Sequence, residues 1–165
     1  MTGFDDLLEA NRSYAESFRY NGVPGVAGKG VAIVTCMDSR IDPLAIMGLE
    51  AGDAKVLRNP GGRITPDALE GVVLAVTLLQ ATRVMIIPHT RCAMGSSTAE
   101  QMRARISESA GGADVSWQPV SVVADQQAAL AADVAVVRSH PLVPDSVTVG
   151  GFVYDVDTGL LTQHV

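Results

Sequence analysis

The chain has 165 residues, of which 47% are hydrophobic, and its mass is 17.2 kDa. This composition supports one globular domain with its own core, which we expect to span residues 1–165. A net charge of −6 and a pI near 4.9 argue against a nucleic-acid-binding or membrane-surface protein, because both classes need a basic face. No segment is typical of a signal peptide or a transmembrane helix, so we expect a cytoplasmic protein with no membrane partner.

The N-terminal part of the chain predicts an amphipathic helix over residues 4–18. Its apolar residues recur at helical spacing, namely Phe4, Leu7, Leu8, Tyr14, Ala15 and Phe18. A glycine-rich loop ends this helix and leads to a short β-branched run, 31–37, which is typical of a strand buried in a parallel sheet. The helix is therefore expected to form an arm, over residues 1–20, that is joined to the body by a flexible segment.

Strands and helices are expected to alternate along the rest of the chain. Asp42 with Pro43 predicts the start of a short helix that ends near Leu49. Residues 55–57 are expected to form a second strand. Thr65 with Pro66 predicts a long helix to about residue 81, followed by a strand over 83–88.

The C-terminal half continues the same alternation. Ser97 and Glu100 have capping-box spacing at the start of a helix, and helical spacing runs again from residue 120 to 137. A fourth strand is expected over 147–156, with a hairpin turn at 157–159. The predicted fold is therefore α/β, with a mainly parallel central sheet flanked by helices and a C-terminal hairpin.

The two cysteines of the chain each follow a predicted strand. Cys36 opens the sequence CMDSR, and Cys92 closes the sequence HTRC, which begins at His89. Ligand sites in parallel sheets lie at the carboxyl ends of the strands, so the two segments meet if the first and third strands are neighbours. Two thiolates and an imidazole suit Zn²⁺ and leave its fourth position open, which is typical of a catalytic site.

Two simpler interpretations of the cysteines are weaker. Either residue alone would most often be a small buried side chain. A reversible disulfide is the least favoured role, because the cysteines are far apart in sequence and form no CxxC pair.

A carboxylate and a guanidinium follow Cys36 closely. Asp38 and Arg40 are two residues apart, so they can form a bidentate pair. Asp38 could then accept a hydrogen bond from water at the metal, or bind the metal itself as a fourth ligand in an inactive state. A surface ion pair of little consequence is the alternative.

CMDSR followed by HTRC resembles the CxDxR and HxxC signature of the β-class carbonic anhydrases, in particular of their short bacterial branch. The resemblance extends to the N-terminal helix, to the loop at 58–62 and to the closing GFVYDVDTG segment. It implies that Cys36, His89 and Cys92 bind one Zn²⁺ per subunit and that Asp38 and Arg40 form a catalytic dyad. It also implies a substrate cleft walled by Asn59, Gly61 and Gly62.

The activity implied by the resemblance is reversible hydration of CO₂ to bicarbonate and a proton, in a homodimer or homotetramer whose N-terminal helix lies on a neighbouring subunit. Packing of that helix on its own core is the alternative. Two rival functions keep the zinc site: hydrolysis of carbon disulfide or carbonyl sulfide, and a non-catalytic structural or regulatory role. Neither His140 nor His164 is favoured as a proton shuttle. Arg63 and Arg91 are candidates to shape an anion path, although a solvated surface position is the commoner case for arginine.

Overall fold

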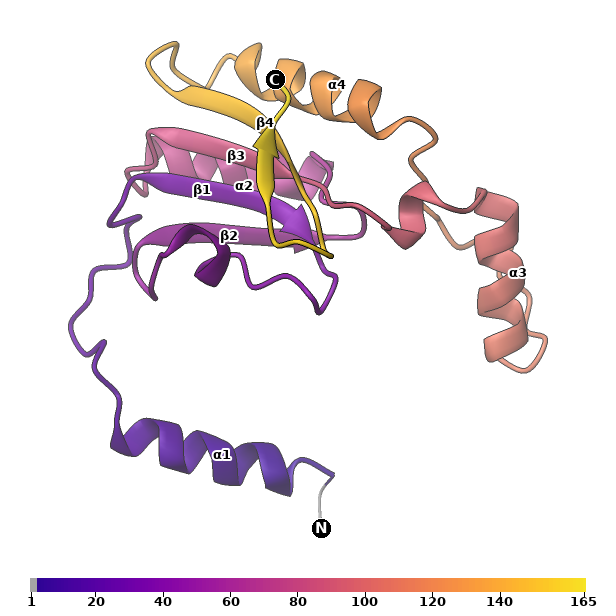
Figure 1. The fold of residues 1–165 in the computed structure, drawn as a ribbon, viewed down its shortest axis with the longest axis horizontal. Helices are drawn as coiled ribbons and strands as arrows, with labels where there is room; N and C mark the ends of the chain where they lie inside the picture. Colours follow the sequence, from indigo (N-terminus) through magenta and orange to yellow (C-terminus); the bar gives the residue numbers. More distant parts are fainter. Residues whose placement is uncertain (1–2) are drawn as a thin grey trace.

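The protein is described by a computed structural model that covers residues 3–165 and contains one five-stranded sheet (Figure 1). Its strand order is β2-β1-β3-β4-β5. The first four strands are mutually parallel, and the last pairs antiparallel with its neighbour. The strands are β1 (Val31–Cys36), β2 (Ala54–Asn59), β3 (Arg83–Ile87), β4 (Thr148–Tyr154) and β5 (Leu161–Gln163). The predicted parallel sheet with a C-terminal hairpin is confirmed.

The two faces of the sheet are covered differently. Helices α2 (Pro66–Thr77) and α4 (Gln126–Arg138) pack on one face, where Val72 and Val134 meet Val34 and Ile86 in the main core. The opposite face is covered by the 3₁₀ turn η1 (Ala45–Met47) and by the C-terminal hairpin, which pack around Ile33. The sheet is therefore buried on both faces, in agreement with the uninterrupted burial of β1.

The register of the central strands brings the two cysteine segments together. β1 lies directly beside β3, with Thr35 opposite Ile87. The hydroxyl of Thr35 also donates a hydrogen bond of 2.7 Å to the Ile87 carbonyl. Cys36 is the last residue of β1, and His89 follows the end of β3 by two positions. The condition under which the two cysteine segments meet, that the first and third strands are neighbours, is thus fulfilled.

Two helices in the first half of the chain are shorter than predicted. The helix expected from Asp42 to Leu49 is only the single turn η1, because Asp42 Oδ1 accepts the N–H groups of Leu44 and Ala45 and Gly48 ends the turn with a φ of +63°. Helix α2 ends at Thr77 rather than near residue 81. Both elements, η1 and α2, still lie within the segments predicted to be helical.

The boundaries in the C-terminal half shift as well. Helix α3 (Ala99–Ser109) is capped by Thr98 and Gln101, not by Ser97 and Glu100. Helix α4 begins at residue 126 and not near residue 120, because Asp125 caps it and Val123 N–H bonds to the Met94 carbonyl. Val123 is thereby tied to the second 3₁₀ turn, η2 (Ala93–Gly95), and lies outside the helix.

Helix α1 (Asp5–Glu16) lies apart from the sheet, at the indigo end of the chain (Figure 1). None of its residues is buried, and Phe4, Leu7, Leu8 and Tyr14 are all more than half exposed. The alternative in which this helix packs on its own core is therefore wrong for this structure. Among residues 3–165, no helix combines the length and the apolar character needed to cross a bilayer.

Candidate metal centre

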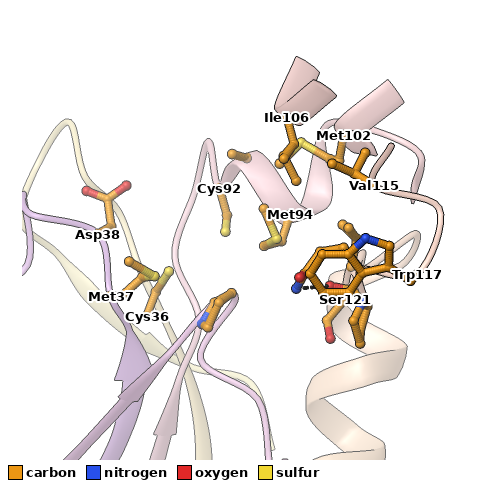
Figure 2. Close-up of a pocket in the computed structure, with 15 residues that line it drawn as sticks. Cys36, Met37, Asp38, Cys92, Met94, Met102, Ile106, Val115, Trp117 and Ser121 are labelled. Carbon is orange, nitrogen blue, oxygen red and sulfur yellow. Dashed lines mark hydrogen bonds between the residues drawn. The ribbon is translucent and has the colours of Figure 1, made fainter. Parts of the chain in front are cut away.

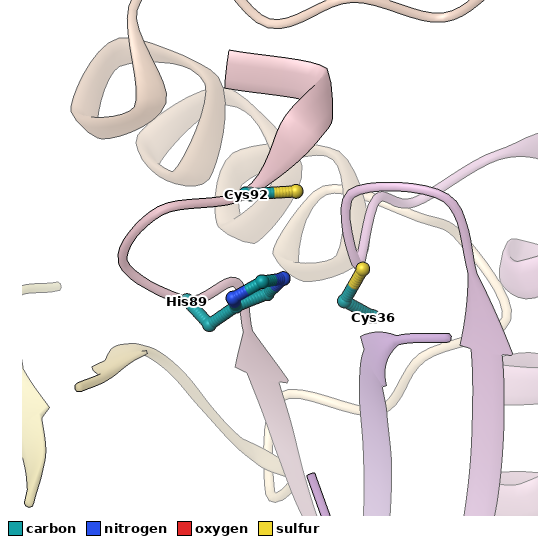
Figure 3. Close-up of side chains that lie close together, drawn as sticks. All are labelled: Cys36, His89 and Cys92. Carbon is teal, nitrogen blue, oxygen red and sulfur yellow. The ribbon is translucent and has the colours of Figure 1, made fainter. Parts of the chain in front are cut away.

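Cys36, His89 and Cys92 converge at the carboxyl ends of β1 and β3 (Figure 3). One donor atom from each residue lies within 4.8 Å of the others, and all three residues are buried. Neither cysteine forms a disulfide. Two sulfurs and one imidazole nitrogen form a donor set suited to Zn²⁺, and three protein ligands leave one tetrahedral position for another group.

The orientation of His89 favours metal binding through Nε2. Its Nδ1 lies 2.8 Å from the Thr90 carbonyl, so Nδ1 carries the hydrogen and Nε2 is left with a free lone pair. The side chain is 1% exposed, and Nε2 has no hydrogen-bond partner among the described residues. A buried nitrogen without a partner costs free energy unless something binds it, so the site fits a metal ion.

The two thiols have different proton affinities. Burial raises the pKa of Cys36, but the neighbouring His89 ring and the Gly61 N–H, 3.4 Å from the sulfur, outweigh it and lower the pKa to about 7. Burial raises the pKa of Cys92 above its ordinary value. The interaction with Cys36 raises the pKa of His89. Cys36 is therefore the thiol that is more readily available as a thiolate.

Asp38 and Arg40 form the expected bidentate pair. Arg40 Nε and Nη2 lie 2.9 and 2.7 Å from the two carboxylate oxygens, and the Arg40 backbone N–H donates a further bond of 3.0 Å. These bonds hold the pKa of Asp38 well below its usual range. Asp38 Oδ2 lies 3.8 Å from His89 Nε2, so an ionised carboxylate stands beside the metal site.

The glycine loop after β2 packs tightly against the metal site. Gly62 has a φ of +64°, and a Cβ atom at this position would lie 2.9 Å from the Cys36 nitrogen. The loop is closed by Asn59, whose side chain accepts from the Arg63 N–H and donates to the Arg63 carbonyl. Asn59 and Gly62 thus shape the loop, while Gly61 contacts the Cys36 sulfur directly.

A cavity of about 580 Å³ opens beside the two cysteines (Figure 2). Asp38 and Pro60 line it near the metal site, and its other wall comes from η2, from α3 and from the segment at 115–121. Most of that wall is apolar, with contributions from Met94, Met102, Ile106, Val115, Trp117 and Pro119. The sequence did not predict this wall.

The remaining polar candidates lie outside the cluster of ligands. Arg63 forms an ion pair with Asp133 of α4, at 2.5 and 3.0 Å, and so it buttresses the glycine loop instead of shaping an anion path. Arg91 is exposed and pairs with Asp157. His140 follows the end of α4 remote from the metal site, since Gln126 at the start of that helix is the residue that contacts His89.

Two residues that support the site had no assigned role in the sequence. Gln126 donates a hydrogen bond of 2.9 Å to the His89 carbonyl. Arg58 donates to the carbonyls of Cys36 and Asp38. Arg58 directly follows the predicted strand 55–57 and opens the loop at 58–62 that resembles the family, whereas the start of α4 was expected too early for Gln126 to be noticed.

The comparisons with known proteins agree with this geometry. Residues 31–161 match the family described as "Carbonic anhydrase". Beta-carbonic anhydrase 1 of Mycobacterium tuberculosis is 32% identical over 99% of this chain and 98% of its own length. A carbon disulfide hydrolase of Acidithiobacillus thiooxidans is 31% identical over 87% of this chain and 80% of its own length.

Solved structures give the same result. The crystal structure of a carbonic anhydrase from Streptococcus mutans superposes with a TM-score of 0.87 and 31% identity, and covers 99% of this chain and 98% of its own. Family match, sequence similarity and fold therefore coincide with a Cys₂His cluster at the carboxyl ends of parallel strands. The chain belongs to the β-carbonic anhydrase family.

Proposed function

We propose that the protein catalyses the reversible hydration of CO₂ to bicarbonate and a proton, with Zn²⁺ held by Cys36, His89 and Cys92. The observation that carries this proposal is the buried Cys₂His cluster with an ionised Asp38 beside it and a cavity in front of it. Membership of the family supports CO₂ as the substrate. Bound Zn²⁺ lowers the pKa of a water in its open position towards 7 and so supplies hydroxide at neutral pH.

The residues around the cluster have separate tasks in this reaction. Thr90 fixes the His89 tautomer through its carbonyl, so that Nε2 faces the metal. Asp38 would accept a hydrogen bond from the oxygen nucleophile and so orient it towards the carbon of CO₂. Arg40 holds the Asp38 carboxylate in its ionised form. Of the loop after β2, only Pro60 lines the described cavity, while Asn59, Gly61 and Gly62, expected from the sequence to wall the cleft, hold the loop against Cys36 from behind.

A non-catalytic zinc site would require Asp38 to fill the fourth position permanently. The bidentate pairing of Asp38 with Arg40 favours the catalytic alternative, because the carboxylate already has its partner. Stopped-flow CO₂ hydration by protein of known zinc content tests the proposal. Absence of hydration at full zinc occupancy, near neutral and at alkaline pH, would refute it.

Hydrolysis of carbon disulfide or carbonyl sulfide is the second candidate function. The apolar wall built by Met94, Met102 and Trp117 favours an uncharged, weakly polar substrate. A relative that is 31% identical is a carbon disulfide hydrolase. Sulfide release, measured on the same zinc-loaded sample as CO₂ hydration, separates the two activities.

The assembly proposed here is a homodimer or homotetramer in which α1 lies on a neighbouring subunit, while residues 1–165 act as one domain. Support comes from the exposed apolar residues of α1, which are not buried against the rest of the described chain.

We place the protein in the cytoplasm, because two free thiols in a metal site are kept reduced in that compartment.

A further inference from the structure

The segment from Cys36 to Asp38 carries both a metal ligand and the carboxylate proposed to direct the hydroxide. Its central residue, Met37, is 63% exposed, so side-chain packing contributes little to holding the segment in place. Its main chain is held instead by the end of the edge strand β2. Arg58 Nε donates to the Cys36 carbonyl at 3.0 Å, and Arg58 Nη2 donates to the Asp38 carbonyl at 2.7 Å.

The strand pairing makes this contact possible. Thr35 lies opposite Arg58 in the parallel register of β1 and β2, and Cys36 lies opposite Asn59. The Met37 N–H donates to the Asn59 carbonyl at 3.1 Å, between the two carbonyls that Arg58 holds. Adjacent residues of β2 therefore fix three consecutive residues of the segment that leaves β1.

Two arginines thus act on Asp38 at different atoms. Arg40 holds the carboxylate, whereas Arg58 holds the main-chain carbonyl. The guanidinium of Arg58 is planar, and its Nε and Nη2 donors have a fixed spacing, so together they set the distance between the carbonyls on either side of Met37. A lysine at the same position could reach only one of these carbonyls at a time.

We propose that Arg58 is a positioning residue, which clamps the main chain on both sides of Met37 and thereby fixes the Cys36 thiol and the Asp38 carboxylate relative to one another. The effect on catalysis rests on the proposed function, while the clamp itself does not. Arg58 is not among the residues that line the described cavity, so its loss is expected to lower kcat with little change in KM. Misplacement of a reacting group by about 1 Å costs about 100-fold in rate.

The test compares Arg58→Ala and Arg58→Lys with the control Arg83→Ala, all as full-length protein. Arg83 is also a strand residue whose side chain donates to a backbone carbonyl, that of Lys29 at 2.7 Å. It is the first residue of β3, so it lies at the end of the sheet opposite to the metal site. Four quantities are measured: zinc content, kcat and KM for CO₂, the thiolate-to-metal absorption of the Co²⁺-substituted protein, and hydrogen exchange of the 37–41 peptide.

The clamp predicts that Arg58→Ala lowers kcat by about 10- to 100-fold at full zinc occupancy. Arg58→Lys should lie between the alanine variant and the unmodified protein. Both should alter the Co²⁺ absorption and speed up exchange in the 37–41 peptide but not in α4. Arg83→Ala should leave kcat, Co²⁺ absorption and the exchange of 37–41 unchanged.

Unchanged Co²⁺ absorption and unchanged exchange of 37–41 in Arg58→Ala would overturn the proposal, as would a lysine variant that equals the unmodified protein in all readouts. If Arg58→Ala does not fold, Arg58→Lys decides alone. If the unmodified protein hydrates no CO₂, the proposed function fails, and the Co²⁺ and exchange measurements still decide whether Arg58 clamps the segment.

Discussion

Asp38 Oδ2 lies 3.8 Å from Nε2 of His89, the buried nitrogen that has no hydrogen-bond partner among the described residues. The same carboxylate is held by Arg40 through two side-chain bonds and one backbone bond. The carboxylate is therefore near the metal site but is restrained by a guanidinium. This relationship separates metal binding from catalysis, because a change at Asp38 should leave the three ligands in place.

We expect Asp38→Ala and Asp38→Asn to retain zinc while kcat for CO₂ hydration falls by about 100-fold or more, since the hydroxide loses its acceptor. Metal analysis and stopped-flow kinetics on the same samples check this. Asp42→Asn is the matched control, because it removes one negative charge from the same loop and preserves the oxygen that caps η1. Retained activity in Asp38→Ala would exclude the proposed dyad.

Removal of a metal ligand, unlike a change at Asp38, should abolish zinc binding itself. Cys92→Ala, Cys36→Ala and His89→Ala are each expected to lose zinc on dialysis against a chelator, and activity should fall in proportion to the remaining metal. His140→Ala is the control, since its ring accepts a hydrogen bond from the Leu142 N–H after the end of α4 and lies outside the metal cluster. A ligand variant that keeps one zinc per chain would show that the cluster is not the metal site.

Zinc affinity should rise with pH between about 6 and 9, because both thiols must lose their protons to bind the metal. Cys36, with a pKa of about 7, is mostly thiolate by pH 8. Cys92, whose pKa burial raises above the ordinary 9.0, still carries its proton there and must release it on binding. Because Cys92 must still lose a proton above pH 7, zinc affinity should continue to rise with pH above neutrality.

Chelator competition across this pH range measures the affinity, and calorimetry in buffers of different ionisation enthalpy counts the protons released. The pKa of Asp38 lies far below this range, so Asp38→Ala should show the same dependence as the unmodified protein. Affinity that does not change between pH 6 and 9 would contradict the assignment of two thiolate ligands.

The metal ligands were predictable from sequence because each follows a buried β-branched run, and parallel pairing brings the ends of such strands together. The Asp38–Arg40 pair was predictable because it is local. The wall of the cavity was not, since Met94 and Trp117 come from segments whose positions depend on long-range contacts such as the bond from Val123 to Met94.

Helix boundaries were the least predictable features. Ser97 and Thr98 both had a possible capping partner three residues later, and only the structure distinguishes Thr98 with Gln101. Apolar periodicity from residue 120 suggested a helix, but a backbone bond to Met94 holds Val123 and Asp125 provides the actual cap. The capping and periodicity signals thus predicted that helices form in these segments, and tertiary packing determined at which residue each helix begins.

The tight approach of Gly62 to β1 makes a quantitative prediction. Gly62→Ala combines an unfavourable φ of +64° with contacts of 2.9 and 3.0 Å to the backbone of Cys36 and Thr35. Gly48→Ala has a φ of +63° but nothing within 4 Å of the added Cβ. Backbone strain alone costs about 1 to 2 kcal/mol, so the Gly48 variant isolates that part.

We expect Gly62→Ala to lower the free energy of unfolding by at least about 1 kcal/mol more than Gly48→Ala, because displaced β1 backbone adds an overpacking cost. It should also reduce zinc affinity, since the contact falls on the ligand Cys36. Urea denaturation of the metal-free proteins and chelator competition measure the two effects. Equal destabilisation by the two variants would show that the loop yields without moving β1.

Helix α1 gives the final prediction. A helix of 12 residues is marginal by itself in water, and Leu7 and Leu8 are 62% and 52% exposed. Burial of the exposed part of each leucine against a neighbouring subunit would contribute about 1 to 2 kcal/mol. The same arm on each subunit can be buried reciprocally in a two-fold assembly. We therefore expect the unmodified protein to be a dimer or tetramer by light scattering.

Leu7→Glu together with Leu8→Glu should shift this assembly towards smaller species, because charge on the apolar stripe opposes its burial. Ser13→Glu adds a carboxylate to the same helix at an exposed polar position, and it should leave the assembly unchanged. Far-ultraviolet circular dichroism verifies that the body remains folded. A monomeric unmodified protein, or equal dissociation by Ser13→Glu, would show that the stripe of α1 is not the contact between subunits.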